Sequence, residues 1–468
     1  MFKKEKLFPN KRVTIMGLGL NGGGVGVAKF FCEQGAEVLV TDLKTRKQLE
    51  KSLKKLRRFK IRYTLGEHKE EDFINTDLLI KNPAVPPTSR YLEVARQNNV
   101  PIETDINLFF KLCKAPIIGV TGTKGKSTTA TIIYEILRRK NRNVILAGNI
   151  GVSPLEFLGK INNWTRVILE LSSFELDDIT KSPQIAVVTA IYPDHLDRYD
   201  SYEKYIESKK LIFKYQNPND YLVLNYENPQ TRDLARSAQS KVYFFSNEFH
   251  LRRVGDRCGC FIEDGRVLFG AEIDPIFNMK DFKLFGTNNV LNLMAAVTVA
   301  KVLNVPNNII RKAVIKFGGI VNRQQLIAQK RGVRYVNDTT ATMPDAVIHA
   351  LRTMKEEFPQ AGIILIAGGQ DKKLEYKDLV SEIVAKVKKI ILLPGTASEK
   401  MRKELAVIKS TIEIIPVESM QEAVKAASVQ AHNGDIVLLS PAAASFNIFK
   451  NEFDRGDQFI QVVRRLKQ

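Results

Sequence analysis

The chain has 468 residues, a formal net charge of +20, 44% hydrophobic and 26% charged residues and four cysteines, which is the composition of a soluble globular protein that folds without disulfides. This length predicts two to four domains. No stretch approaches the roughly eighteen apolar residues of a membrane-spanning helix, and the N-terminus lacks an apolar signal region, so we expect neither membrane insertion nor export.

The positive charge is distributed along the whole chain. An excess of 71 Lys and Arg over 51 Asp and Glu is compatible with an anionic partner such as nucleic acid, a membrane surface or a phosphorylated metabolite. Runs such as "KSLKKLRRFK" (51–60) are typical of solvated faces of lysine-rich helices, and no basic motif has interleaved aromatic residues. We therefore expect no nucleic-acid partner.

The first segment, residues 1–113, begins with a strand, a glycine turn, a helix and a second strand. The run "RVTIMG" leads into "GLGLNG", and "EVLVTD" follows the helical stretch. Such a βαβ unit builds a parallel sheet. The turn matches G-x-G-x-x-G at Gly17, Gly19 and Gly22, with Asp42 about twenty residues further on. This pattern predicts a nucleotide diphosphate site; an NAD site and a turn that serves packing alone are the alternatives.

The second segment, residues 114–323, contains the loop "GVTGTKGKSTT" at 119–129. In the usual P-loop the first glycine would stand where Val120 stands, so the spelling differs. An apolar strand runs into the loop and a helix runs out of it, so backbone N–H groups and the helix dipole converge on one point. We predict phosphate binding here rather than a chance G-K-S, with Lys126 on the β- and γ-phosphates and Ser127 on Mg²⁺.

Two further candidates follow, and then a third segment. In "VILELSSFELDD" a strand ends at Glu170, where ligands gather in parallel sheets, although a surface carboxylate on an edge strand is the alternative. In "YPDHLDRY" His195 stands beside Asp194 and Asp197, and a single histidine is more often structural than catalytic. Residues 324–468 alternate apolar runs such as "GIILIAGG" and "DIVLLSP" with helical stretches, which predicts three α/β domains in all.

These motifs together resemble the Mur ligase family. The loop matches its A/G-x-x-G-x-x-G-K-[ST] pattern at Gly119, Gly122, Gly125 and Lys126. Further blocks match in order along the chain: "GNIG", "LELSSFELD", "DHLDRY", "YIESKKLI", "GTNNVLN", "VNDTTAT", "AGGQDKK" and "SPAAASFNIFKN". The resemblance implies an N-terminal Rossmann-like domain, a central P-loop ATPase-like domain with a parallel sheet, and a C-terminal Rossmann-like α/β domain. Within the family the blocks are most similar to the ligases that add D-glutamate to UDP-N-acetylmuramoyl-L-alanine.

The resemblance also implies roles for individual residues. The positions that bind the UDP substrate are Gly17, Leu18, Gly19, Asn21, Gly22, Asp42 and Asn149. The ATP-binding positions are Gly122, Thr123, Lys124, Gly125, Lys126, Ser127, Thr128, Asn292, Arg323 and Asp338. The amino-acid positions are Thr342, Lys372 and Ser445, and the catalytic ones are Lys126, Glu170, His195 and Lys209.

Two Mg²⁺ ions are implied, held by Ser127, Glu170, His195 and Lys209. Lys209 is expected to carry a carbamate, with Lys210 as the adjacent rival. A carbamate turns a cation into an oxygen ligand of the kind that Mg²⁺ prefers.

Several positions depart from the family pattern. Lys124 replaces a common Asn; Asn322 and Gln325 replace the His and Glu of an H-R-x-E block; Thr340 stands where a Lys is frequent; "KNPAVP" stands where "SPG" is usual; and "KNEFDRG" places Phe453 one position away from the expected aromatic residue. Lys124 adds a cation near the phosphate position; together the departures leave the expected reaction class unchanged and bear on the D-glutamate pocket and the uridine-end contacts.

We therefore expect an ATP-dependent ligase of peptidoglycan precursor synthesis, a monomer in the bacterial cytoplasm. A sister ligase for another amino acid and a catalytically idle homologue that binds nucleotide are the alternatives within the family. An NAD-dependent dehydrogenase would rest on "GLGLNG" alone, and a nucleic-acid-stimulated NTPase on the charge alone.

Overall fold

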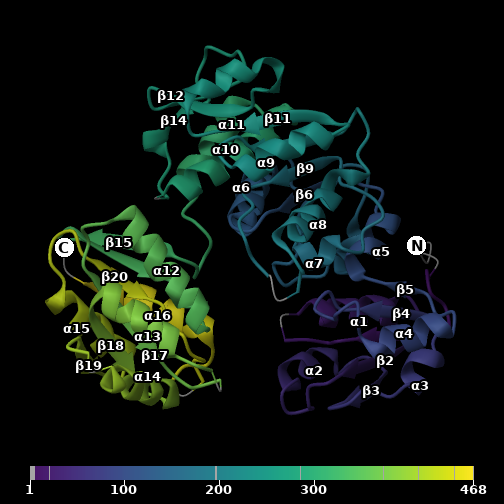
Figure 1. Cartoon of the computed structure of the whole chain (residues 1–468), viewed down its shortest axis with the longest axis horizontal. Helices are drawn as coiled ribbons and strands as arrows, with labels where there is room; N and C mark the ends of the chain where they lie inside the picture. Colours follow the sequence, from purple (N-terminus) through teal and green to yellow (C-terminus); the bar gives the residue numbers. More distant parts are fainter. Residues whose placement is uncertain are drawn as a thin grey trace. The chain divides into compact units, whose positions relative to one another are not determined.

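The computed structural model describes residues 6–20, 22–195, 198–284, 286–372, 374–408, 410–446 and 448–466, so Asn21 and Asp197 lie outside the described residues. The chain divides into two compact units (Figure 1). The first unit comprises Met1–Phe282 and Asn288–Lys316, and the second comprises Lys283–Thr287 and Phe317–Gln468.

The first sheet of unit 1 is parallel, with strand order β3-β2-β1-β4-β5. Its strands are β1 (Arg12–Met16), β2 (Glu37–Asp42), β3 (Ile61–Leu65), β4 (Leu78–Lys81) and β5 (Ile102–Glu103). Its helices are α1 (Gly23–Glu33), α2 (Glu50–Leu56), α3 (Glu71–Ile74), α4 (Arg90–Gln97) and α5 (Asp105–Leu112). The glycine turn joins β1 to α1, as the βαβ pattern predicts.

The second sheet of unit 1 is also parallel, with strand order β11-β10-β9-β6-β8-β7. Its strands are β6 (Ile117–Thr121), β7 (Val144–Gly148), β8 (Arg166–Glu170), β9 (Ile185–Val188), β10 (Tyr221–Asn225) and β11 (Lys241–Phe245). The helices between them are α6 (Lys126–Lys140), η1 (Pro154–Lys160), α7 (Ser173–Leu176), α8 (Tyr202–Lys214), α9 (Pro229–Leu234) and η2 (Ala235–Ser237).

A small antiparallel sheet and two longer helices complete unit 1. They follow η3 (Phe249–Arg257) and comprise β12 (Cys260–Glu263), β13 (Arg266–Phe269), β14 (Phe277–Asn278), η4 (Met279–Asp281), α10 (Thr287–Val302) and α11 (Asn307–Lys316). One hydrophobic core extends over the helices and strands of both parallel sheets in this unit. The first two predicted segments therefore share a packed interface, in which α1 and α5 contact η1.

Unit 2 is built on a mixed sheet with strand order β15-β16-β20-β17-β18-β19, in which β15 alone runs antiparallel to its neighbour. Its strands are β15 (Gln325–Lys330), β16 (Val333–Asn337), β17 (Ile363–Gly368), β18 (Val387–Leu393), β19 (Glu413–Pro416) and β20 (Ile436–Leu439). Its helices are α12 (Pro344–Glu357), α13 (Lys377–Lys386), α14 (Thr396–Val407), α15 (Met420–Gln430) and α16 (Glu452–Arg465). Separate hydrophobic clusters cover the two faces of the sheet.

Among the described residues, no helix is both long enough and apolar enough to cross a membrane.

Candidate active site

The phosphate loop lies between β6 and α6 and is closely packed at two glycines. Gly122 has φ +144° and Gly125 has φ +87°. A Cβ atom on Gly122 would lie 2.1 Å from the Thr189 hydroxyl, and one on Gly125 would lie 2.1 Å from the Asn292 side-chain oxygen. Any side chain at these positions would have to displace its neighbours, so the loop keeps its backbone N–H groups at the start of α6 only with glycine there.

Lys126, the first residue of α6, folds back over this loop. Its ammonium group donates hydrogen bonds to the carbonyls of Gly122 at 2.9 Å and Thr123 at 3.0 Å. Ser127 and Thr128 follow in the first turn of the helix. Lys124 is exposed, and its backbone carbonyl accepts a hydrogen bond from the Thr189 hydroxyl at 2.5 Å. Lys126 thus lies over the loop itself, whereas Lys124 lies at the surface.

Glu170 ends β8 directly beside the strand that enters the loop, because it pairs in register with Val120 of β6. Its side chain is buried, and Oε1 accepts a hydrogen bond from the Asn149 amide at 2.9 Å. Oε2 is buried and has no hydrogen-bond partner among the described residues. A buried carboxylate oxygen without a partner is costly, so its chemistry fits a hard cation bound at this edge of the sheet.

Lys209 is buried in α8 on the same side of the sheet. Its ammonium nitrogen lies 3.1 Å from the hydroxyl of Thr121, the last residue of β6. Burial, and then the nearby charge of Lys126, lower the pKa of Lys209 well below its usual range. The rival Lys210 is partly exposed and pairs with Glu207. The structure thus brings Lys209, and not Lys210, to the edge where the phosphate loop begins.

His195 lies in the segment between β9 and α8 with a left-handed backbone, φ +52°. Its side chain is half-exposed, and its ring centroid lies 4.8 Å from that of Phe174. Nε2 lies 3.7 Å from a carboxylate oxygen of Asp194. In the described part of the chain, no group of three or more His, Cys, Asp or Glu side chains could hold a metal ion. The predicted metal ligands therefore include different residue types: Glu170 and His195 belong to these four types, whereas Ser127 and Lys209 do not.

A cavity of about 410 Å³ opens at the carboxyl ends of the first sheet and is bounded by the second. Its lining includes, of the predicted substrate positions, Gly17, Leu18, Gly19 and Asn149. A second cavity of about 310 Å³ is lined by Asp42, His68 and Tyr91, and several residues, Lys44 and Asn82 among them, line both. The two cavities together can take a ligand that extends from the first sheet toward Glu170.

Asp42, one of the predicted UDP-substrate positions, accepts hydrogen bonds from two nearby backbone N–H groups. One carboxylate oxygen accepts a hydrogen bond from the Gly19 N–H at 3.0 Å, and the other from the Lys44 N–H at 2.8 Å. Asp42 therefore holds the glycine turn through the Gly19 N–H. Gly22, in the same turn, is packed so closely that a Cβ atom would lie 2.8 Å from the Gly151 carbonyl oxygen.

Two buried carboxylates that the sequence analysis missed line the same cavity as Asn149. Glu175 accepts hydrogen bonds from the N–H and the hydroxyl of Ser172, both at 2.7 Å, and burial raises its pKa to about 7. Asp105 accepts a hydrogen bond from the Ser153 hydroxyl at 3.0 Å, and burial raises its pKa as well. The capping-box spacing of Ser172 and Glu175 was the signal that could have identified the first of them.

In unit 2, the predicted amino-acid positions lie on neighbouring loops. Lys372 donates a hydrogen bond to the Thr342 hydroxyl at 2.8 Å. Gln370 and Ala444 exchange backbone hydrogen bonds at 2.8 and 3.0 Å, which places Ser445 beside the loop that carries Lys372. The Ser445 hydroxyl is buried and, within the described residues, has no hydrogen-bond partner. A buried hydroxyl of this kind is suited to a polar ligand group.

Asp338 follows β16 and is buried. Its carboxylate accepts hydrogen bonds from the Ser440 hydroxyl at 2.9 Å and the Gln324 N–H at 3.1 Å, and burial raises its pKa to about 7. Asn292, in contrast, lies in α10 of unit 1, where the Thr129 hydroxyl donates to it at 3.3 Å. Arg323 lies on the loop before β15, next to Gln324.

Three departures from the family pattern contact one another. The Asn322 N–H donates to the Gln325 side-chain oxygen at 3.1 Å, and the Thr340 hydroxyl donates to the Asn322 carbonyl at 2.9 Å. Phe453, in contrast, is exposed in the first turn of α16. The first three substitutions thus form one local arrangement.

Arg455 was not predicted as a functional residue and is fully buried in α16. It donates hydrogen bonds to the hydroxyl and the carbonyl of Thr339 at 3.0 and 2.9 Å and to the Ala443 carbonyl at 3.1 Å. No carboxylate pairs with it in the part of the chain that the structure describes. Arg455 therefore ties the loop that leads to Thr342 to the loop that carries Ser445.

Family models match most of the chain. The Mur ligase MurD-like N-terminal domain matches residues 11–104, the Mur ligase middle domain 120–300, and the Mur ligase glutamate ligase domain 322–443. The UDP-N-acetylmuramoylalanine–D-glutamate ligase of Roseiflexus sp. (strain RS-1) is 42% identical over 97% of this chain and 98% of its own length. The protein of the same name from Borreliella afzelii (strain PKo) is 37% identical over 98% of each chain.

Solved structures share the fold. UDP-N-acetylmuramate–alanine ligase MurC from Thermotoga maritima aligns with a TM-score of 0.59 at 19% identity, over 97% of this chain and 99% of that one. MurF ligase from Thermotoga maritima, in complex with ADP, aligns with a TM-score of 0.52 at 18% identity over 98% of each chain. The prediction of three α/β domains is confirmed, with the addition that the last sheet is mixed. The chain belongs to the Mur ligase family, together with full-length relatives that are named UDP-N-acetylmuramoylalanine–D-glutamate ligase.

Proposed function

We propose that this protein is the ATP-dependent ligase that joins D-glutamate to UDP-N-acetylmuramoyl-L-alanine in peptidoglycan precursor synthesis. The observation that carries the proposal is the edge of the second sheet, where the unpartnered Glu170 oxygen, buried Lys209 and the phosphate loop lie on adjoining elements. The full-length relatives of that name support the choice of substrates. The protein would act as a monomer in the bacterial cytoplasm.

We assign each of the three substrates to a different part of the chain. Residues 1–113 would bind the UDP substrate, 114–323 ATP, and 324–468 the amino acid. The cavity pair in unit 1 and the loops of Thr342, Lys372 and Ser445 in unit 2 support the first and last assignments.

The phosphate loop would hold ATP. Lys126 would exchange its two loop carbonyls for phosphate oxygens, and the backbone N–H groups of 122–126 would donate to the same phosphates. The remaining ATP contacts would come from Thr123, Lys124, Ser127, Thr128, Asn292, Arg323 and Asp338. Asp338 accepts hydrogen bonds from the Gln324 N–H and the Ser440 hydroxyl. We therefore expect it to position the loop that carries Gln324 as well as to contact the ribose of ATP.

Mg²⁺ would be held by Ser127, Glu170, His195 and a modified Lys209, as two ions. When bound, these ions neutralise charge on the phosphoryl group that is transferred. The lowered pKa of Lys209 favours the neutral amine, which is the form that can react with CO₂ to give a carbamate.

The ligation is expected to run in two steps. Transfer of the terminal phosphoryl group of ATP to the alanyl carboxylate gives an acyl phosphate and ADP. The neutral amine of D-glutamate then attacks the acyl carbon, phosphate leaves, and the nitrogen loses a proton. Lys126 and the loop N–H groups would balance charge on the phosphoryl group, while Lys372 would hold a carboxylate of D-glutamate as a compact point charge.

The sugar nucleotide would occupy the two cavities of unit 1. The glycine turn at Gly17, Gly19 and Gly22 would approach its diphosphate, and Asn149 would meet the muramoyl end. Asp42 would contribute indirectly, by holding the glycine turn in place through its hydrogen bonds to the Gly19 and Lys44 N–H groups.

The test is phosphate release from ATP and Mg²⁺ with UDP-N-acetylmuramoyl-L-alanine and a panel of D-Glu, L-Glu, L-Ala, L-Lys and meso-diaminopimelate. We expect release with D-Glu only, together with the mass of the amide product. Turnover with a different amino acid would retain the ligase chemistry and overturn the substrate. ATP binding without release for any amino acid would support an idle homologue.

A further inference from the structure

The wall of the sugar-nucleotide cavity includes a short loop of the first sheet, residues 81–84, which we name the wall loop. It begins at Lys81, the last residue of β4, and all its residues line the first cavity. It is also the first part of "KNPAVP", one of the departures from the family pattern. Its Asn82 amide donates to the Gly17 carbonyl at 3.3 Å, and its side-chain oxygen accepts from the Ala84 N–H at 3.0 Å. The wall loop is therefore tied to the glycine turn that follows the adjacent strand β1.

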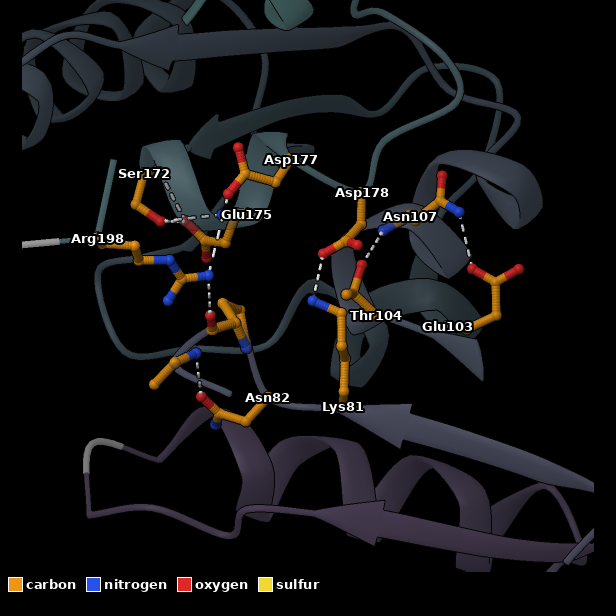
Figure 2. A network of polar contacts seen from close by, with 12 residues as sticks. Lys81, Asn82, Glu103, Thr104, Asn107, Ser172, Glu175, Asp177, Asp178 and Arg198 are labelled. Carbon is orange, nitrogen blue, oxygen red and sulfur yellow. Dashed lines mark hydrogen bonds and ion pairs between the residues drawn. The ribbon is translucent and has the colours of Figure 1, made fainter. Parts of the chain in front are cut away.

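The first residue of the wall loop reaches the second sheet. The Lys81 ammonium nitrogen lies 2.6 Å from a carboxylate oxygen of Asp178, just beyond α7, as Figure 2 shows. Only 7% of the Lys81 side chain is exposed. The Asp178 side chain is 31% exposed, so the pair is partly buried and is screened less than a fully exposed pair; loss of Asp178 would leave the Lys81 charge buried.

A second contact holds the same loop two residues further on. The Arg198 guanidinium donates to the Pro83 carbonyl at 3.1 Å. It lies 3.8 Å above the ring of Phe174 and 3.9 Å from a carboxylate oxygen of Asp177, beside which Figure 2 places it. Phe174 lines the cavity and also contacts the His195 ring. Arg198 thus connects the wall loop to the segment that carries His195.

Neither Asp178 nor Arg198 is among the described residues that line the two cavities. Asp178 nevertheless contacts Lys81 and Arg198 contacts Pro83, and both of these residues line the first cavity. Fixing the wall loop before the ligand arrives would lower the ordering cost of binding, which is a route to affinity that needs no contact with the ligand.

We propose that Asp178 and Arg198 are positioning residues for the sugar nucleotide: they clamp the wall loop at Lys81 and Pro83 and so set the affinity of the cavity for UDP-N-acetylmuramoyl-L-alanine. The inference rests on the proposed function of that cavity. It also gives the "KNPAVP" departure a role, because Lys81 supplies one of the two attachment points.

The test uses isothermal titration calorimetry on the full chain with UDP-N-acetylmuramoyl-L-alanine in the absence of ATP, and separately with a non-hydrolysable ATP analogue and Mg²⁺. We expect Asp178→Asn and Arg198→Met each to raise the Kd of the sugar nucleotide about tenfold and to leave that of the ATP analogue within twofold. Arg198→Lys should recover part of the loss, because a lysine keeps one donor but loses the planar stacking on Phe174. The matched control is Asp233→Asn, an exposed carboxylate that faces Arg236 in the same unit, and it should change neither constant.

A double-mutant cycle isolates the Lys81 contact. Lys81 lines the cavity, so Lys81→Met is expected to weaken binding by itself. In that background, Asp178→Asn should have no further effect, because its partner is gone. An equal effect in both backgrounds overturns the clamp at Lys81.

Other outcomes also decide the question. Variants that bind the sugar nucleotide as the parent does overturn the inference, as does an equal loss for both ligands, which would mean general loosening. A parent protein that does not bind the sugar nucleotide overturns the proposed function instead. Thermal melting checks folding, and if Arg198→Met does not fold, Asp178→Asn and the cycle with Lys81 decide.

Discussion

The Lys209 ammonium nitrogen lies 3.1 Å from the Thr121 hydroxyl, at the end of the strand that leads into the phosphate loop. The Thr121 hydroxyl itself donates to the Leu171 carbonyl at 2.7 Å, one residue beyond Glu170. Through this pair, helix α8 and the ends of β6 and β8 are held together. The lysine that we expect to be modified is therefore fixed by the strand ends at which we propose that the phosphates and the metal bind.

Lys209→Ala is expected to lower kcat at least 100-fold, because under the proposed function it would remove a metal ligand beside the transferred phosphoryl group. Added short carboxylates such as formate or acetate should restore part of the activity by replacing the carbamate oxygens. Lys210→Ala is the matched control and should stay within twofold of the parent, since its side chain pairs with Glu207 near the surface. Steady-state phosphate release measures both. Full activity in Lys209→Ala would refute the assignment.

Lys126→Ala is expected to lower kcat/KM by about 10² to 10³-fold or more, because the charge that balances the phosphoryl oxygens is lost. Lys124→Ala, at the exposed position of the same loop, should have an effect below about tenfold. Phosphate release and ATP-analogue affinity are measured for both variants. Similar losses in the two would show that net charge near the loop, and not the position of Lys126, determines the rate.

The phosphate loop and Glu170 could be predicted from the sequence because their signals are local. An apolar run, a glycine turn and a helical period specify β6, the loop and α6 without any distant contact. Strands β3, β7, β11 and β15 were not predicted, and each of them lies at the edge of its sheet. All four are only partly buried, whereas the central strands β6 and β17 are fully buried.

Partners far apart in the sequence could not be predicted. Nothing in the local pattern indicates that Lys81 pairs with Asp178, and the fingerprint that identified Asp42 does not show that its oxygens bind Gly19 and Lys44. The same holds for the departures in the last segment. Asn322 and Gln325 belong to one sequence block, but nothing local indicates that Thr340 donates a hydrogen bond to the Asn322 carbonyl.

Arg455→Met is expected to lower the free energy of unfolding of unit 2 by about 2 to 4 kcal/mol, because it leaves the Thr339 and Ala443 carbonyls without their buried donor. The loops that carry Thr342 and Ser445 would loosen, so the KM for D-glutamate should rise more than the KM for ATP. Burial lowers the pKa of Arg455 to about 10, so it stays charged at neutral pH.

Arg464→Met, at an exposed position of the same helix, is the control for this experiment. Urea unfolding followed by circular dichroism gives the stability, and initial rates give the two KM values. A stable Arg455→Met protein with unchanged KM values would mean that the buried guanidinium holds neither loop.

Glu175 predicts a pH dependence of stability that can be isolated with one substitution. Burial raises its pKa from 4.5 to about 7, so between these values the folded chain binds a proton that the unfolded chain has lost. The unfolding free energy must therefore fall as the pH rises through this window, and the contribution is constant below 4.5 and above 7. The size of the loss is on the order of 3 kcal/mol.

Glu175→Gln removes the titrating group but keeps an oxygen that can accept from the Ser172 N–H. Relative to the parent, the variant should therefore gain stability between pH 4.5 and pH 8, with exposed Glu71→Gln as the baseline. Urea midpoints at several pH values give the difference. The gain must follow the titration of a single group, because the Ser172 bonds are made in both proteins. A difference that stays flat across this range would mean that the Glu175 carboxyl is ionised in the folded protein and that its burial is compensated by the hydrogen bonds of Ser172.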